Sequence, residues 1–172
     1  MNKVRITSGK LKGCKIATPG GATHPMGERE RLALFNMISG EIVDANVLDA
    51  FAGSGALGIE ALSRGAKSVA FIEQNSGAVK VIRNNLADLR LNAEVVQGKV
   101  SSFQTRSKYG VILADPPYDD FRIEEVKSLI PLMAEGSVLV LSHPWEAPAL
   151  EGLMLLKSRK YAGATISLYH LG

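Results

Sequence analysis

A glycine-rich turn between a strand and a helix most limits the folds open to this chain. Residues 47–61 read VLDAFAGSGALGIEA, with an apolar start typical of a buried strand and an end typical of a helix. Gly53 and Gly55 stand in the turn, where the lack of a Cβ permits positive φ and lets a ligand lie against the backbone. Gly58 allows the helix to pack closely on the strand. The segment therefore predicts a parallel α/β sheet with a ligand site at one edge.

Strands and helices alternate along the rest of the chain. The expected strands are 3–7, 14–18, 46–50, 68–73, 94–97, 110–114 and 137–142, and the expected helices are 28–38, 57–64, 77–89 and 123–133. Residues 153–161 and 164–171 are expected to form a hairpin that turns at Ala162 and Gly163. The pattern predicts an α/β fold whose sheet is mostly parallel, with helices on both faces, an antiparallel C-terminal hairpin and a small N-terminal β-hairpin extension.

Length and composition limit the number of domains. The chain has 172 residues, of which 46% are hydrophobic and 22% charged, as in an ordinary globular domain. We expect one domain over residues 1–172, with a basic hairpin at 1–22 and the core at 23–172. Cys14 is the only cysteine and no cluster has zinc-ligand spacing, so we expect a cytoplasmic protein without a disulfide or a metal. Its apolar stretches are too short to span a membrane.

Basic residues gather at the N-terminus. Residues 1–15 contain five basic residues and no acidic one, whereas the rest of the chain has a net charge of −2. Counterion release makes such clusters bind nucleic acid. We therefore expect Arg5, Lys10, Lys12 and Lys15 to contact phosphates, and the alternative is a solvated hairpin that only favours solubility.

Two carboxylates indicate the ligand class of the glycine turn. Glu73 ends the strand after the turn, where it could accept hydrogen bonds from ribose hydroxyls, so a nucleoside-bearing cofactor is expected. Asp49 precedes Gly53 by four residues, and its charge would repel a dinucleotide pyrophosphate but attract the cationic S-adenosylmethionine. Two alternatives stay open: Asp49 caps backbone amides, and the turn is purely structural.

A second motif, Asp115-Pro116-Pro117-Tyr118, follows an apolar strand directly. The prolines fix φ and lack an N–H, so they end the strand in a stiff turn at the same sheet edge as the glycine turn. Asp115 and the Pro116 carbonyl could accept the hydrogens of an exocyclic amine, and Tyr118 could stack on its base. The motif favours amine methylation, and a structural turn is the alternative.

The motifs together resemble the class I S-adenosylmethionine-dependent methyltransferases, and more narrowly the RsmD family, which methylates a guanine N2 in bacterial 16S ribosomal RNA. The resemblance is carried by RITSG at 5–9 with Gly13, by Pro25 with Arg29, Arg31 and LFN at 34–36, by residues 48–66 and by residues 115–118. It implies a Rossmann-like class I methyltransferase sheet, S-adenosyl-L-methionine as cofactor, and 16S rRNA or a small-subunit assembly intermediate as partner. We expect a monomer.

With the residues above, the resemblance completes the expected site. The catalytic residues would be Asp115, Pro116, Pro117 and Tyr118. The cofactor would contact Asp49, Phe51, Gly53, Ser54, Gly55, Glu73, Gln74, Val100 and Asp115. The RNA would contact Arg5, Lys10, Lys12, Lys15, Arg29 and Arg31.

Some positions depart from the family's pattern. His24 and Met26 replace an arginine and a threonine, Leu32 replaces a glutamate, and Lys99 stands where an acid is expected near the adenine amine. Residues 141–145 read LSHPW where the family often has a glutamate. Two other functions therefore stay open: an adenine-N6 methyltransferase acting on DNA or RNA, and a non-catalytic RNA-binding assembly factor with the same fold. A nicotinamide dehydrogenase ranks last.

Overall fold

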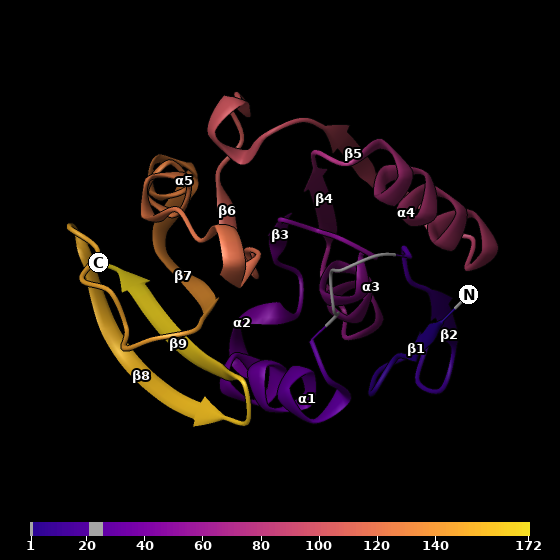
Figure 1. The fold of residues 1–172 in the computed structure, drawn as a ribbon, viewed down its shortest axis with the longest axis horizontal. Coiled ribbons are helices and arrows are strands. Elements are labelled where there is room, and N and C mark those ends of the chain that lie inside the picture. The colour runs from indigo at the N-terminus through magenta and orange to yellow at the C-terminus, as the bar shows by residue number, and fades with distance from the viewer. Residues whose placement is uncertain (1, 21–25) are drawn as a thin grey trace.

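The computed structural model describes residues 2–20 and 26–172 and contains a seven-stranded sheet and a separate two-stranded hairpin (Figure 1). The strands are β1 (Lys3–Arg5), β2 (Lys15–Ala17), β3 (Asn46–Ala50), β4 (Ser68–Glu73), β5 (Glu94–Gln97), β6 (Tyr109–Ala114), β7 (Met133–His143), β8 (Leu153–Tyr161) and β9 (Ala164–Leu171). The helices are α1 (Glu28–Met37), α2 (Ser39–Ile42), α3 (Ala56–Ser63), α4 (Ser76–Asp88) and α5 (Ile123–Lys127).

The large sheet has the strand order β5-β4-β3-β6-β7-β9-β8. The first five strands are parallel, and β9 pairs antiparallel with both β7 and β8. The chain runs from β3 outward to β5 and then returns to β6 beside β3, so the topology switches direction between β3 and β6. Ligands bind at such a switch point, outside the carboxyl ends of the strands. The predicted fold class is confirmed.

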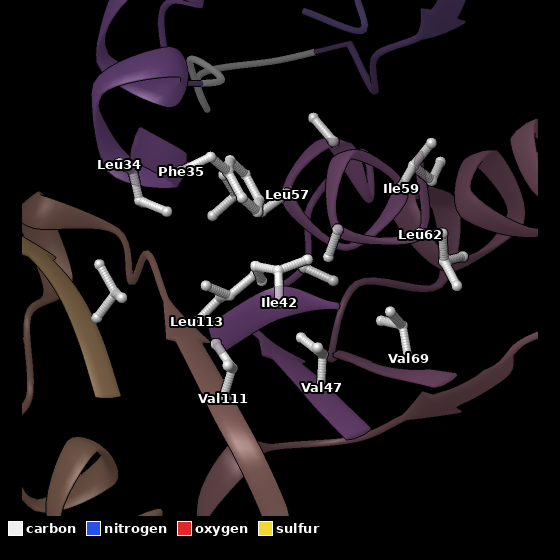
Figure 2. Packing of buried hydrophobic residues seen from close by; sticks show 14 of the residues in the cluster. Leu34, Phe35, Ile42, Val47, Leu57, Ile59, Leu62, Val69, Val111 and Leu113 are labelled. Carbon is white, nitrogen blue, oxygen red and sulfur yellow. The ribbon is translucent and has the colours of Figure 1, made fainter. Parts of the chain in front are cut away.

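The central strands β3, β4 and β6 are buried on both faces, and their alternate residues enter two different cores. On β6, Val111 and Leu113 pack in one cluster, whereas Ile112 and Ala114 pack in the other. The first cluster receives side chains from α1 to α4, and Figure 2 shows Leu34, Phe35 and Leu57 among them. The second receives Val126 of α5 and residues from the loops. Helices therefore cover both faces, but most of them cover the face with α1.

The segment expected to be a helix at 123–133 differs from the prediction. The helix ends at Lys127, a 3-10 turn spans Ile130–Leu132, and β7 already begins at Met133. Pro131 accounts for the early end, because it cannot donate an N–H and disfavours α conformation in the residue before it. The expected boundary at residues 22 and 23 lies outside the described residues, as do His24 and Pro25.

The N-terminal hairpin of β1 and β2 is held on α3 by the buried carboxylate of Glu60. The backbone N–H groups of Thr7 and Ser8 donate to Glu60 Oε1 and Oε2, at 2.9 and 3.1 Å. Arg31 Nε lies 3.2 Å from Oε1, and Arg64 Nε lies 3.2 Å from Oε2. Two guanidiniums and two amides thus solvate a carboxylate that is fully removed from water.

The hairpin also fits closely against the end of α3 and against α4. Gly9 has a φ of +83°, and a Cβ there would overlap the carbonyl oxygen of Ser63. That carbonyl accepts the N–H of Lys10 at 2.9 Å. Asn85 of α4 pairs with both backbone groups of Ala17, each at 2.9 Å. Only glycine therefore fits where the hairpin turn meets α3.

No helix in the described ranges is long and apolar enough to cross a membrane.

A glycine-to-alanine pair tests this docking. Gly9 and Gly13 have similar positive φ values, but a Cβ at Gly13 would meet nothing within 4 Å. Gly13→Ala should lower the free energy of unfolding by about 1–2 kcal/mol, the cost of a left-handed alanine. Gly9→Ala should lower it at least twice as much, because it also separates the hairpin from Ser63. Urea denaturation measures both, and equal losses would contradict the docking argument.

Candidate active site

A cavity of about 850 Å³ opens at the carboxyl edge of the sheet. The ends of β3, β4 and β6, the start of α1 and the turn between β8 and β9 all contribute to its walls. Its size lies within the range of small-molecule and cofactor sites. The glycine turn and the Asp115–Tyr118 motif both line it, so the structure brings the two sequence motifs together.

The glycine turn follows β3 directly and forms one wall of the cavity. Phe51, Gly53 and Ser54 line it, and Phe51 and Gly53 have φ values of +59° and +56°. Gly55, with φ +82°, is the N-cap of α3 and faces Ile82 and Phe71 of the core rather than the cavity. Gly55 therefore shapes the turn, and the expectation that it contacts the cofactor has no support in its position.

Gly58 has the predicted packing role. A Cβ at this position would overlap the ring of Phe71 on β4, so the glycine lets α3 lie close to the sheet.

Asp49 lies behind the glycine turn and is 1% exposed. Its Oδ2 accepts the backbone N–H of Gly58 at 2.9 Å, so it does cap an amide. Its Oδ1 is buried without a hydrogen-bond partner among the described residues. Burial raises the pKa of Asp49 well above its usual range; the Gly58 hydrogen bond opposes the shift, and the nearby charges of Asp115 and Glu73 add to it. A cation close to the turn would stabilise the ionised form.

Glu73 joins the glycine turn to the start of α4. Its Oε1 accepts the N–H of Gly53 at 3.0 Å, and its Oε2 accepts the N–H of Asn75 at 2.8 Å. A carboxylate has about four acceptor positions, so each oxygen keeps one for a ligand hydroxyl. Gln74 and Val100, which are expected to contact the cofactor, line the same cavity.

The Asp115–Tyr118 motif forms the opposite wall. Asp115 follows β6, and burial raises its pKa to about 6, although a hydrogen bond from Ser142 opposes the shift. The Tyr118 hydroxyl pairs with the hydroxyl of Ser142 on β7, which fixes the ring. Burial raises the pKa of Tyr118 to about 12, so its hydroxyl stays protonated at neutral pH. The motif thus presents a titratable acceptor beside an oriented aromatic ring.

Sequence reasoning missed several contributors to the cavity. Ser142 could have been found, because it lies near the carboxyl end of a predicted strand, where sites of this fold occur. Glu30 and the turn at Ala162 and Gly163 also line the cavity. Their positions depend on how α1 and the C-terminal hairpin pack, and no local pattern in the sequence reports that.

The basic residues expected at RNA differ in their surroundings. Lys10, Lys12, Lys15 and Arg29 are exposed, and Arg5 is exposed but pairs with Glu28 at 3.0 Å.

Arg31 corrects the prediction. It is 1% exposed, its Nε pairs with Glu60, and its Nη2 donates to the carbonyl of Arg5. A guanidinium that is buried and bonded in this way holds α1 to the hairpin and is not available to a phosphate.

The departures from the family's pattern also have places in the structure. Lys99 is exposed at the cavity, beside Val100, and Met26 lines the cavity at the start of α1. Leu32 is exposed on α1. His143 is buried, and its Nε2 lies 2.7 Å from Ser167 Oγ, so it belongs to the core. Within residues 2–20 and 26–172, no group of three His, Cys, Asp or Glu side chains could hold a metal ion.

Comparisons with known proteins agree with this arrangement. Residues 4–170 match the family described as conserved hypothetical protein 95. The ribosomal RNA small subunit methyltransferase D of Escherichia coli is 39% identical over 132 residues, which cover 74% of this chain and 67% of the relative. The candidate rRNA methyltransferase YlbH of Bacillus subtilis is 29% identical, over 96% of this chain and 98% of the relative.

The fold of this chain also agrees with that of solved structures. The structure of yhhF, a candidate methyltransferase of Escherichia coli, superposes with a TM-score of 0.90 at 32% identity. The match covers 99% of this chain and 98% of the other. With the family match over nearly all of the sequence and this agreement in fold, the chain belongs to the family of conserved hypothetical protein 95, the RsmD-type methyltransferases.

Proposed function

We propose that this chain methylates the N2 amine of a guanine in 16S ribosomal RNA, with S-adenosyl-L-methionine as the methyl donor. The observation that carries the proposal is that the glycine turn and the Asp115–Tyr118 motif line a single cavity. The Escherichia coli relative, named a ribosomal RNA small subunit methyltransferase, supports the substrate class. The exposed basic side chains of the N-terminal hairpin supply positive charge that suits the phosphates of RNA.

The residues present suit the cofactor. S-adenosylmethionine, when bound, supplies an activated methyl group on a cationic sulfonium. Behind the turn, Asp49 has a buried oxygen that finds no hydrogen-bond partner in the part of the chain that the structure describes, and Glu73 keeps acceptor positions for ribose hydroxyls. Phe51, Gly53 and Ser54 would cover the nucleoside. A site with buried carboxylates near the turn favours a cationic ligand over an anionic one.

The Asp115–Tyr118 motif would prepare the amine for attack. The lone pair of a guanine N2 is delocalised into the base, so two acceptors on its hydrogens favour a reactive pyramidal geometry. The Asp115 carboxylate and the Pro116 carbonyl would be those acceptors, held by the fixed φ of Pro116 and Pro117. As the new N–C bond forms, the bond between the methyl group and the sulfonium sulfur breaks, its electron pair stays on the sulfur, and the amine loses one proton. Asp115 would receive this proton and, with a pKa of about 6, return it to solvent at neutral pH.

Tyr118 would hold the base while this happens. Extracting a guanine from a folded RNA costs a few kcal/mol. Stacking on the ring restores about 1–3 kcal/mol of that cost. The hydroxyl of Ser142 holds the tyrosine hydroxyl, so the ring is oriented before the base arrives.

The product identifies the reaction. We expect the purified protein, incubated with S-adenosylmethionine and an unmodified 16S rRNA fragment, to produce N2-methylguanosine. Nucleoside digestion followed by mass spectrometry measures it. N6-methyladenosine would instead assign the adenine enzyme, and absence of any methylated nucleoside despite cofactor binding would favour the assembly factor.

The methylation rate should depend on the ionisation of Asp115. Only the ionised carboxylate can take up the proton that the amine releases, so the single-turnover rate should rise with pH from 5 to 7 and then level off. The bound cationic cofactor moves the midpoint below the value of about 6 found for the protein alone. Asp115→Asn should abolish this rise and lower the rate at least tenfold, about 1.4 kcal/mol in the barrier. A pH profile that the substitution leaves unchanged would remove Asp115 from the chemistry.

The cofactor affinity should depend on the charge of Asp49. Asp49→Asn keeps an oxygen for the Gly58 N–H but removes the negative charge, so calorimetry should show S-adenosylmethionine binding weakened by about tenfold. Asp44→Asn removes an exposed charge and serves as the control. We also expect NAD to bind more weakly than S-adenosylmethionine. Normal affinity in Asp49→Asn would leave Asp49 only its capping role.

A further inference from the structure

The acidic residues of this chain are confined to its middle, which leaves both ends basic. All 17 acidic residues lie between Glu28 and Glu151. The N-terminal hairpin accounts for one basic end. The other is strand β8, whose second half contains Lys157, Arg159 and Lys160. No charge of β8 takes part in an ion pair with any residue of the described ranges.

The pairing of β8 with β9 shows which way these side chains point. Lys157 lies opposite Leu168, and Arg159 lies opposite Ile166. Directly paired residues of an antiparallel ladder point to the same face of the sheet. Leu168 and Ile166 pack in the cluster that also contains side chains of α1 and of the N-terminal hairpin. Lys157 and Arg159 therefore point to the face of the sheet that carries α1, whereas Lys160, opposite Thr165, points to the other face.

Strand β8 ends at the cavity. The turn that follows it, at 162–164, lines the cavity, and so do Thr18 and Pro19 at the end of the N-terminal hairpin. In Figure 1 the two hairpins lie on opposite sides of α1. One face of the molecule thus has a basic element on each side of the cavity, with α1 between them.

We propose that Lys157 and Arg159, on the α1 face of strand β8, form a second RNA-phosphate contact surface across the cavity from the N-terminal hairpin. The two side chains alternate along one strand and lie about 6–7 Å apart, which lets both contact one stretch of RNA backbone. Both side chains are exposed and neither has an ion-pair partner among residues 2–20 and 26–172, so both charges are available to phosphates. The inference rests on the proposed function for the identity of the RNA. It adds that the substrate is held at two points, so that the nucleotide between them lies over the cavity.

Binding measurements at several salt concentrations test the surface. The probe is a fluorescent 16S rRNA fragment, and the variant is Lys157→Gln with Arg159→Gln, which removes both charges but keeps polar side chains on an exposed edge strand. We expect weaker binding, with the slope of log affinity against log salt reduced by roughly 0.7–0.9 per lost contact. Lys160→Gln removes a charge from the opposite face of the same strand and is the matched control. Its affinity and slope should stay near those of the unchanged protein.

Three results would overturn the inference. The first is unchanged affinity in the double variant. The second is an equal loss per charge in Lys160→Gln, which would mean that only net charge matters. The third is a dimer that sedimentation detects in the unchanged protein and not in the double variant. In that case Lys157 and Arg159 would contact a second copy of the chain and not RNA.

A methylation assay separates this inference from the proposed function. At saturating RNA the double variant should methylate at a single-turnover rate within about twofold of the unchanged protein, since it touches neither Asp115 nor the glycine turn. If the unchanged protein produces no N2-methylguanosine, the proposed function fails. The RNA affinity of the double variant still shows whether Lys157 and Arg159 contact RNA.

Discussion

The carboxylate of Glu60 is the contact on which the N-terminal part of the structure depends. It is fully buried, and it accepts hydrogen bonds from the turn after β1 and from the guanidiniums of Arg31 and Arg64. Leaving such a charge without its partners costs about 3–5 kcal/mol, so the hairpin, α1 and α3 are positioned together or not at all. Because Arg31 also borders the cavity, the same carboxylate fixes the start of α1 beside the site.

The centre of the sheet was predictable because β3, β4 and β6 are short, mostly apolar runs, and the C-terminal hairpin was predictable from the turn residues at 162 and 163. The observed bounds of β3, β4, β5, β8 and β9 agree with the expected ones. The start of strand β7 was harder to predict. The continuously buried part of the strand begins at Ser137, whereas the four residues before it are partly polar and include Gly136. The short helix before it resembles a longer one until the effect of Pro131 is considered.

The site was predictable in its motifs and less so in its details. Residues near the carboxyl ends of β3, β4 and β6 had to meet at one edge, and they do. Arg31 could not be distinguished from a surface arginine such as Arg29, because the difference arises from a partner 29 positions along the chain. Ser142 is likewise linked to Tyr118 only through the pairing of β6 with β7. Sequence patterns report local conformation, whereas burial and partners depend on the assembled fold.

The double amide contact of Glu73 has a consequence for how a ligand enters. The carboxylate holds the glycine turn through the N–H of Gly53 and the N-cap of α4 through the N–H of Asn75. Ribose hydroxyls would be added to acceptor positions that are still free, so no existing bond has to break. The turn is therefore preorganised, and a nucleoside bound there would lose little affinity to the conformational entropy of ordering the loop.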